Sequence, residues 1–160
     1  LTALSACQVT PTSSNIRLQP ERGAFSPAEW TSIPAQVVDY QAADGTPLKG
    51  WYWAGWQTGA PLIMYLHGPS GHLGYSAQYL RYIIQEGHPV FIPEYRGFGP
   101  NDGQASMASM QEDALGAFNT AQAMARGSGN IILMTHSTGS QSAATILEQF
   151  PRQVRALTAC

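Results

Sequence analysis

The stretch from Asn130 to Ala144, NIILMTHSTGSQSAA, limits most strongly what this chain can fold into. Residues 131–135 form an unbroken run of apolar and β-branched side chains, which is typical of a strand in a parallel sheet covered on both faces. The next four residues are small or polar, and a helical pattern follows them and ends before Pro151. The sequence therefore predicts a buried strand that turns sharply into a helix.

This sharp turn places Ser137 at its tip. A serine there points its hydroxyl out of the carboxyl end of the sheet, beside a helix N-terminus that favours developing negative charge. The small residues Gly139, Ser140 and Ser142 let the helix approach the strand closely. The geometry suits a nucleophile. The alternative is an ordinary strand-to-helix turn in which the serine only caps the helix.

The rest of the chain alternates strand and helix patterns. Residues 37–40 and 48–53 are strand-like and flank Asp44-Gly45, a strong hairpin signal. Helical patterns separate the further strands that we predict at 61–66, 89–93, 131–135 and 154–160. This alternation predicts an α/β fold, with a mostly parallel sheet, helices on both faces and an antiparallel hairpin at the amino-terminal end.

Local signals add detail to this plan. Ser109 and Glu112 have the spacing of a capping box, which predicts a helix start there. The tryptophans Trp51, Trp53 and Trp56 are expected to pack on a sheet face. Ligands of parallel sheets bind beyond the carboxyl ends of the strands. Three loops are predicted to meet there: 67–71, 94–103 and the turn at Ser137.

Three motifs in order resemble the α/β-hydrolase family. Thr135-His136-Ser137-Thr138-Gly139 resembles its G-x-S-x-G nucleophile elbow, with threonine in place of the first glycine. HG at positions 67–68 and YRGFG at 95–99 precede it. The resemblance covers roughly residues 37–160 and is closest to small esterase, lipase and thioesterase-like serine hydrolases. It implies an α/β-hydrolase-type sheet and hydrolysis of carboxylic or thio-esters through an acyl-enzyme on Ser137.

The resemblance also implies an oxyanion hole. The first expected donor is the Thr138 N–H, and the second comes from the loop after His67-Gly68. Pro69 has no N–H, so the Ser70 N–H is the substitute donor if the loop is shifted. Pro69 and Thr135 also favour a second hypothesis, a catalytically inactive α/β-hydrolase-like binding scaffold at the cell envelope.

The other polar residues near the site receive structural interpretations. His67 is expected to shape its loop, and Arg96 to do the same for the loop that follows the next strand. His136 is expected to point away from Ser137 and to serve in packing, which leaves His72 as the histidine with some freedom to face the site. Glu94, Arg96 and Asp102 are placed near its rim. The histidines give no metal motif, and no cofactor is expected.

A triad acid and base are missing after Ser137. In the family the order is serine, acid, histidine. Here no aspartate or histidine follows the serine, and the only later acid is Glu148, inside the elbow helix. We therefore expect a fragment of a hydrolase that lacks its carboxyl-terminal strands and has little turnover by itself. A naturally short, inactive relative is the competing explanation.

The amino-terminal end suggests a membrane anchor. Leu4-Ser5-Ala6-Cys7 resembles the lipobox of bacterial lipoproteins, in which the cysteine is lipidated. On this hypothesis residues 1–6 are a signal-peptide remnant, 7–36 a tether and 37–160 the hydrolase domain. The protein would then be lipid-anchored or periplasmic in a bacterial cell envelope.

Composition excludes some other partners. Charged residues make up 11% of the chain, the formal net charge is -2, and Lys49 is the single lysine, so nucleic-acid binding is not expected. A nucleotide-binding domain is disfavoured because Gly97-Phe98-Gly99 lacks the third glycine of the dinucleotide fingerprint. The expected partner is a small-molecule ester or acyl substrate, and the oligomeric state stays open.

Overall fold

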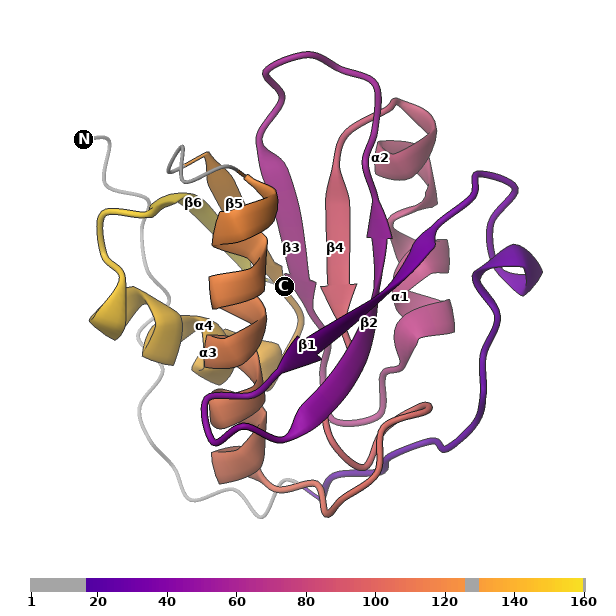
Figure 1. Cartoon of the computed structure of the whole chain (residues 1–160). Helices are drawn as coiled ribbons and strands as arrows, with labels where there is room; N and C mark the ends of the chain where they lie inside the picture. Colours follow the sequence, from indigo (N-terminus) through magenta and orange to yellow (C-terminus); the bar gives the residue numbers. More distant parts are fainter. Residues whose placement is uncertain (1–16, 126–129, 160) are drawn as a thin grey trace.

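The computed structural model describes residues 17–125 and 130–159, and its strands form one six-stranded sheet with helices on both faces (Figure 1). The strands are β1 (Gln36–Gln41), β2 (Pro47–Trp53), β3 (Leu62–Leu66), β4 (Val90–Pro93), β5 (Ile131–Thr135) and β6 (Val154–Ala159). The helices are the 3-10 turn η1 (Pro27–Glu29), α1 (Leu73–Tyr79), α2 (Arg81–Gln85), α3 (Met107–Met124) and α4 (Gly139–Gln149).

The strand order is β1-β2-β4-β3-β5-β6. The pairs β1/β2 and β2/β4 are antiparallel, whereas β3/β4, β3/β5 and β5/β6 are parallel. This confirms the predicted α/β class with its amino-terminal hairpin. Leu66 lies opposite Thr135 in the register of β3 and β5. The loops that follow these two strands therefore start level with each other.

Two hydrophobic cores lie on the two faces of the sheet. Strand β3 is buried along its whole length, and its side chains alternate between the cores. Leu62, Met64 and Leu66 face the core under α3 and α4, and Ile63 and Tyr65 face the core under α1 and α2. Figure 1 shows these helix pairs on opposite sides of the sheet. In the described residues, no helix combines the length and the apolar character needed to cross a membrane.

Two local predictions are wrong. The capping box is formed by Ser106 and Ser109, so the N-cap of α3 lies three residues before the predicted one and the helix begins at Met107. Ser106 Oγ accepts from the Ser109 N–H at 3.0 Å, and Ser109 Oγ accepts from the Ser106 N–H at 2.9 Å. A serine hydroxyl thus does what a glutamate carboxylate usually does. Trp51 and Trp53 are buried on the sheet as expected, but Trp56 is 62% exposed because it lies in the loop after β2.

Residues 17–35, which we call the amino-terminal strap, lie against the domain although the sequence places them in a tether. The Gln19 N–H donates to the Pro69 carbonyl at 2.8 Å, and the Glu21 carbonyl accepts from the Gly99 N–H at 2.8 Å. The strap runs past the ends of β3 and β4 at the bottom of Figure 1. Backbone hydrogen bonds, which composition does not reveal, hold it. Cys7 and the lipobox lie outside the described residues, so the lipid anchor stays a prediction.

Candidate active site

The turn between β5 and α4 has the sharp geometry that the sequence predicts. Ser137 has a φ of 51°, and within residues 17–125 and 130–159 it is the only residue other than glycine with a positive φ. The Gly139 N–H donates to the His136 carbonyl and the Ser140 N–H to the Ser137 carbonyl, both at 3.0 Å. The side chain of Ser137 is exposed at the tip of this turn.

The residues on either side of Ser137 explain how the chain can bend so tightly. A Cβ atom on Gly139 would lie 2.1 Å from the Leu66 carbonyl oxygen, so glycine is required where α4 approaches β3. Thr135, at the position of the family's first glycine, is buried, and its Oγ1 lies 3.0 Å from Ser140 Oγ. The threonine is accommodated because its hydroxyl finds a partner in the first turn of α4.

Gly68 and the turn that follows it bring the loop after β3 against the elbow. A Cβ on Gly68 would lie 3.2 Å from Ser137 Cβ and 2.9 Å from His136 Nδ1. The Gly71 N–H donates to the Gly68 carbonyl at 3.2 Å, so Pro69 and Ser70 form the tip of a turn, in which Ser70 is exposed and Pro69 is half-buried. The structure therefore places Gly68 directly beside the candidate nucleophile, and Ser70 lines the same cleft as His136.

Thr138 is the predicted first oxyanion donor, and it is buried immediately before the start of α4. Backbone N–H groups at this end of a helix have no acceptor inside the helix, so the Thr138 N–H is suited to bind an anion. Its side-chain Oγ1 is buried and makes no hydrogen bond within the described part of the chain. The Thr138 hydroxyl therefore does not hold the site together by a hydrogen bond, and the proposed role of this residue rests on its backbone N–H.

His67 and Glu94 form a buried pair below the loop after β3. His67 Nε2 lies 2.5 Å from Glu94 Oε1, and the two side chains are 2% and 0% exposed. The expectation that Glu94 lies near the rim of the site is wrong, because its carboxylate is enclosed by backbone donors and the imidazole. A contact that spans 27 positions of sequence leaves no local signal, so sequence reasoning did not find this pair.

Two histidine interpretations are also wrong. His72 is fully buried, stacks on Phe25 with ring centroids 4.3 Å apart, and accepts from the Gly74 N–H at 3.0 Å as the N-cap of α1. It has no freedom to face the site. His136 is exposed instead of packed inside. Its ring lines a cleft of about 290 Å³ that lies between the loop after β3 and α1.

The lining of this cleft includes His136, the residue immediately before Ser137. Tyrosines from β3 and α1, namely Tyr65, Tyr75 and Tyr79, line it together with Ser70 and His136. Tyr75 and Tyr79 are about half exposed, at 51% and 52%. The cleft thus offers aromatic surface next to the elbow, and aromatic side chains are a usual part of the lining of a small-molecule site.

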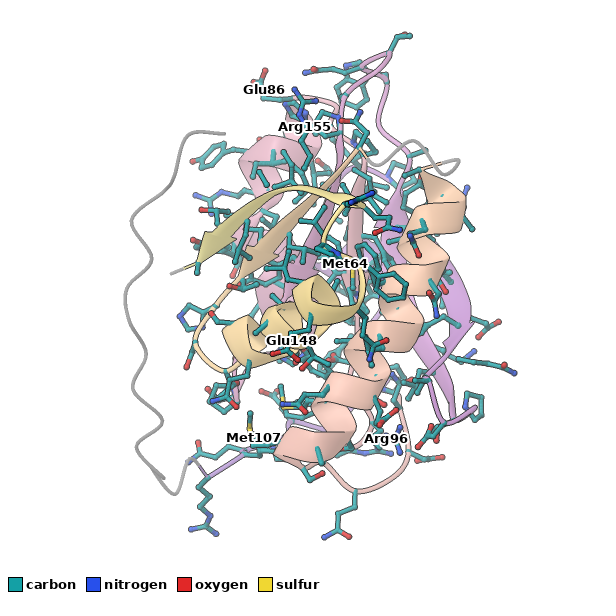
Figure 2. The ribbon with its side chains drawn as sticks, turned by 90° about the vertical axis from the view of Figure 1, so that its left-hand side faces the viewer. Met64, Glu86, Arg96, Met107, Glu148 and Arg155 are labelled. Atoms are coloured by element: carbon teal, nitrogen blue, oxygen red, sulfur yellow. The ribbon has the colours of Figure 1, made fainter. Side chains whose placement is uncertain are left out.

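Arg96 does not reach the site. Its Nε donates to Asp113 Oδ1 at 2.8 Å, and its terminal nitrogens bond Asp44 at 2.7 and 3.0 Å. Figure 2 shows Arg96 beside the lower end of α3. The Arg96 guanidinium holds the pKa of Asp44 well below its usual range, whereas burial raises the pKa of Asp113. Arg96 therefore fixes its loop, as predicted, and substrate contact is not supported.

No acid–base pair for Ser137 occurs in residues 17–125 and 130–159. His67 and Glu94 bond each other, and His72 caps α1 with Glu21 at 3.6 Å from its Nε2. Asp102, which the sequence places near the rim, is exposed and paired with Arg22. The same part of the chain contains no group of three or more His, Cys, Asp or Glu side chains that could hold a metal ion.

Comparisons with known proteins agree with this geometry. The family model described as serine aminopeptidase, S33 (Hydrolase_4) matches residues 59–160. The chain is 32% identical over 137 residues to lysophosphatidylserine lipase ABHD12 of Xenopus tropicalis, a match that covers 84% of this chain and 34% of the relative. It is 29% identical over 110 residues to protein YfhR of Escherichia coli strain K12, covering 66% and 37% of the two chains.

Solved structures show the same fold. The esterase Pf2001 of Pyrococcus furiosus superposes with a TM-score of 0.68 at 20% identity, over 88% of this chain and 55% of that chain. Epoxide hydrolase A of Mycobacterium thermoresistibile gives a TM-score of 0.59 at 17% identity, over 79% and 39%. The chain spans about a third of the length of the two sequence relatives and about half of the esterase.

Proposed function

Because this chain belongs to the serine aminopeptidase S33 family of α/β-hydrolases, we propose that Ser137 is the nucleophile of a hydrolase that cleaves carboxylic or thio-esters. The observation that carries the proposal is the positive φ of Ser137, 51°, at the tip of the turn between β5 and α4. A strained residue that presents a hydroxyl at the carboxyl edge of the sheet is suited to a nucleophile and has no evident use in packing.

The proposed reaction has two halves. A base removes the proton of the Ser137 hydroxyl as its oxygen attacks the ester carbonyl, and the Thr138 N–H donates to the oxyanion that forms. Collapse of this intermediate expels the alcohol or thiol with the proton that the base holds. Water then attacks the acyl-enzyme in the same way and releases the acid. In the whole protein we propose that the base and its acid come from outside residues 1–160, with Ser70 N–H as the candidate second donor.

Relatives support an ester as the substrate. ABHD12 of Xenopus tropicalis is a lysophosphatidylserine lipase, and its match covers 84% of this chain. The tyrosine-lined cleft supports the same proposal, because it offers room and aromatic surface for one half of an ester beside His136, the neighbour of Ser137.

A fluorophosphonate probe tests the proposal in the whole protein. The wild type should form a covalent adduct on Ser137, and Ser137→Ala should remove the adduct and lower the rate of p-nitrophenyl acetate hydrolysis by at least about 10³-fold. Ser32→Ala, a change at an exposed serine of the strap, is the matched control and should react like the wild type. A folded wild-type protein that stays unlabelled would contradict the hydrolase and favour the inactive binding scaffold.

The lipid anchor belongs to the same proposal for the whole protein. Its support is the lipobox-like run that ends at Cys7, which would hold a bacterial protein at the cell envelope. Fatty-acid labelling that is unchanged in Cys7→Ser would remove this part of the proposal and leave the hydrolase untouched.

A further inference from the structure

The loop beside Ser137 rests on a buried chain of hydrogen bonds that the proposed mechanism does not use. His67 Nδ1 lies 2.8 Å from the Gly68 carbonyl oxygen, and His67 Nε2 lies 2.5 Å from Glu94 Oε1. A carbonyl oxygen only accepts, so the Nδ1 atom must carry a proton. Gly68 in turn abuts Ser137, because a Cβ on this glycine would lie 3.2 Å from Ser137 Cβ. The contacts thus lead from Glu94 through His67 to Gly68, which lies beside the elbow.

The glutamate at the start of this chain is held from several sides. Glu94 Oε2 accepts from the Leu73 N–H at 2.9 Å, and Glu94 Oε1 accepts from the Tyr95 N–H at 3.2 Å as well as facing His67. A fully buried carboxylate persists only when its oxygens find such donors. One side chain therefore joins the end of β4, the start of α1 and the loop after β3.

Neither member of the pair is placed to react with a substrate. His67 is 2% exposed and both of its ring nitrogens are engaged, so it cannot take the proton of Ser137. Glu94 is 0% exposed, and its Oε1 faces the His67 ring, which itself lines the cleft. The pair can act on the reaction only by fixing where the loop lies.

We infer that Glu94 is a positioning residue which, through His67, fixes the Gly68–Ser70 backbone against Ser137. The inference rests on the proposed function, since the backbone it positions includes the candidate oxyanion donor at Ser70. Donors of an oxyanion hole work only when they already stand where the negative charge develops. We call the contact of Glu94 with His67, and of His67 with Gly68, the clamp. Loss of the clamp should therefore slow the chemical step and leave the binding of the ester nearly unchanged.

The test uses Glu94→Gln, His67→Gln and the double variant in the whole protein, with p-nitrophenyl acetate as substrate. Glu94→Gln should lower kcat about 10- to 100-fold and change KM by less than about 2-fold. The double variant should be no slower than the slower single variant, because two residues of one clamp are not additive. Glu148→Gln, a change at an exposed glutamate of α4, is the matched control and should match the wild type.

A second measurement uses the wild-type protein alone, so it does not depend on whether a substituted variant folds. In ¹⁵N-histidine-labelled wild-type protein, His67 Nδ1 should be protonated and slow to exchange with water, and Nε2 should show a strong hydrogen bond. A His67 ring protonated on Nε2 alone would overturn the inference, as would an unchanged kcat in a folded Glu94→Gln protein. A wild type that hydrolyses no ester and takes up no fluorophosphonate would contradict the proposed function instead. The NMR result would still show whether Glu94 and His67 hold the Gly68 backbone.

Discussion

The two loops that meet at Ser137 are held in different ways. The elbow is held by its own backbone, with a positive φ at Ser137 and with Gly139 packed against the Leu66 carbonyl. The loop after β3 is held from outside, by Glu94 through His67 and by the strap through the hydrogen bond from Gln19 to Pro69. One side of the site is therefore fixed by close main-chain packing against β3, and the other by hydrogen bonds from Glu94, His67 and the strap.

This difference indicates which changes each loop tolerates. The elbow depends on residues whose substitution meets backbone atoms, and backbone atoms cannot move aside cheaply. The loop after β3 depends on side chains and on hydrogen bonds, so it can shift while the sheet stays intact. We expect substitutions in the elbow to affect stability most, and substitutions in the other loop to affect catalysis more than stability.

Gly139→Ala should give the largest loss of stability. A small loss would contradict the proposed difference between the elbow and the loop after β3. The added carbon would lie 2.1 Å from the Leu66 carbonyl oxygen, so we expect a loss of about 3 kcal/mol in the free energy of unfolding. Urea denaturation measures it. Gly45→Ala is the control, because Gly45 has a φ of 85° with open space around it and should lose only about 1 kcal/mol. Equal losses would show that the close approach of α4 to β3 is unimportant.

Gly68→Ala tests the contact between the two loops. The added carbon would lie 2.9 Å from His136 Nδ1 and 3.2 Å from Ser137 Cβ, and the exposed His136 ring can rotate away. We expect a loss of about 1 kcal/mol in stability and about 10-fold in kcat for p-nitrophenyl acetate, because the nucleophile is displaced. Gly23→Ala, whose added carbon would meet the Phe25 ring at 3.0 Å, is the control for crowding away from Ser137. A rate that falls equally in both variants would contradict the prediction.

Protonation of His72 should give the smallest loss of stability. Because the His72 ring stacks on Phe25, this loss reports on the attachment of the strap. Burial lowers its pKa from the usual value near 6.5, with Glu21 and Glu94 opposing and His67 adding to the shift. The neutral imidazole is therefore the folded form. Its contribution to stability is complete above the unfolded pKa of about 6.5 and is lost as the pH falls toward the lower folded value.

We expect a lower urea midpoint at pH 5.5 than at pH 7.5, together with smaller hydrogen-exchange protection factors in the strap at the lower pH. The shift should be smaller than the effect of either glycine substitution. His72→Asn keeps an N-cap for α1 and should flatten this pH dependence. An equal pH dependence in the variant would assign the effect to other groups.

The sequence predicts the local half of the site and misses the distant half. The strand, turn and helix around Ser137 are contiguous, so periodicity and small residues predict them well. Glu94 meets His67 across 27 positions, and Gln19 meets Pro69 across an even longer separation, and neither contact has a pattern in the chain. For the same reason the strap looked like a tether and His136 looked like a packed residue. Exposure at a turn depends on neighbours that only the fold supplies.

The hydrogen bond from Gln19 to Pro69 also has a mechanical meaning. The strap precedes β1, and this is its first backbone hydrogen bond to the rest of the domain along the described chain. A pulling force applied at the amino-terminal side would therefore load the turn next to Ser137 before it loaded any strand of the sheet. Tension at that end would reach the loop beside the candidate nucleophile while the fold was still intact.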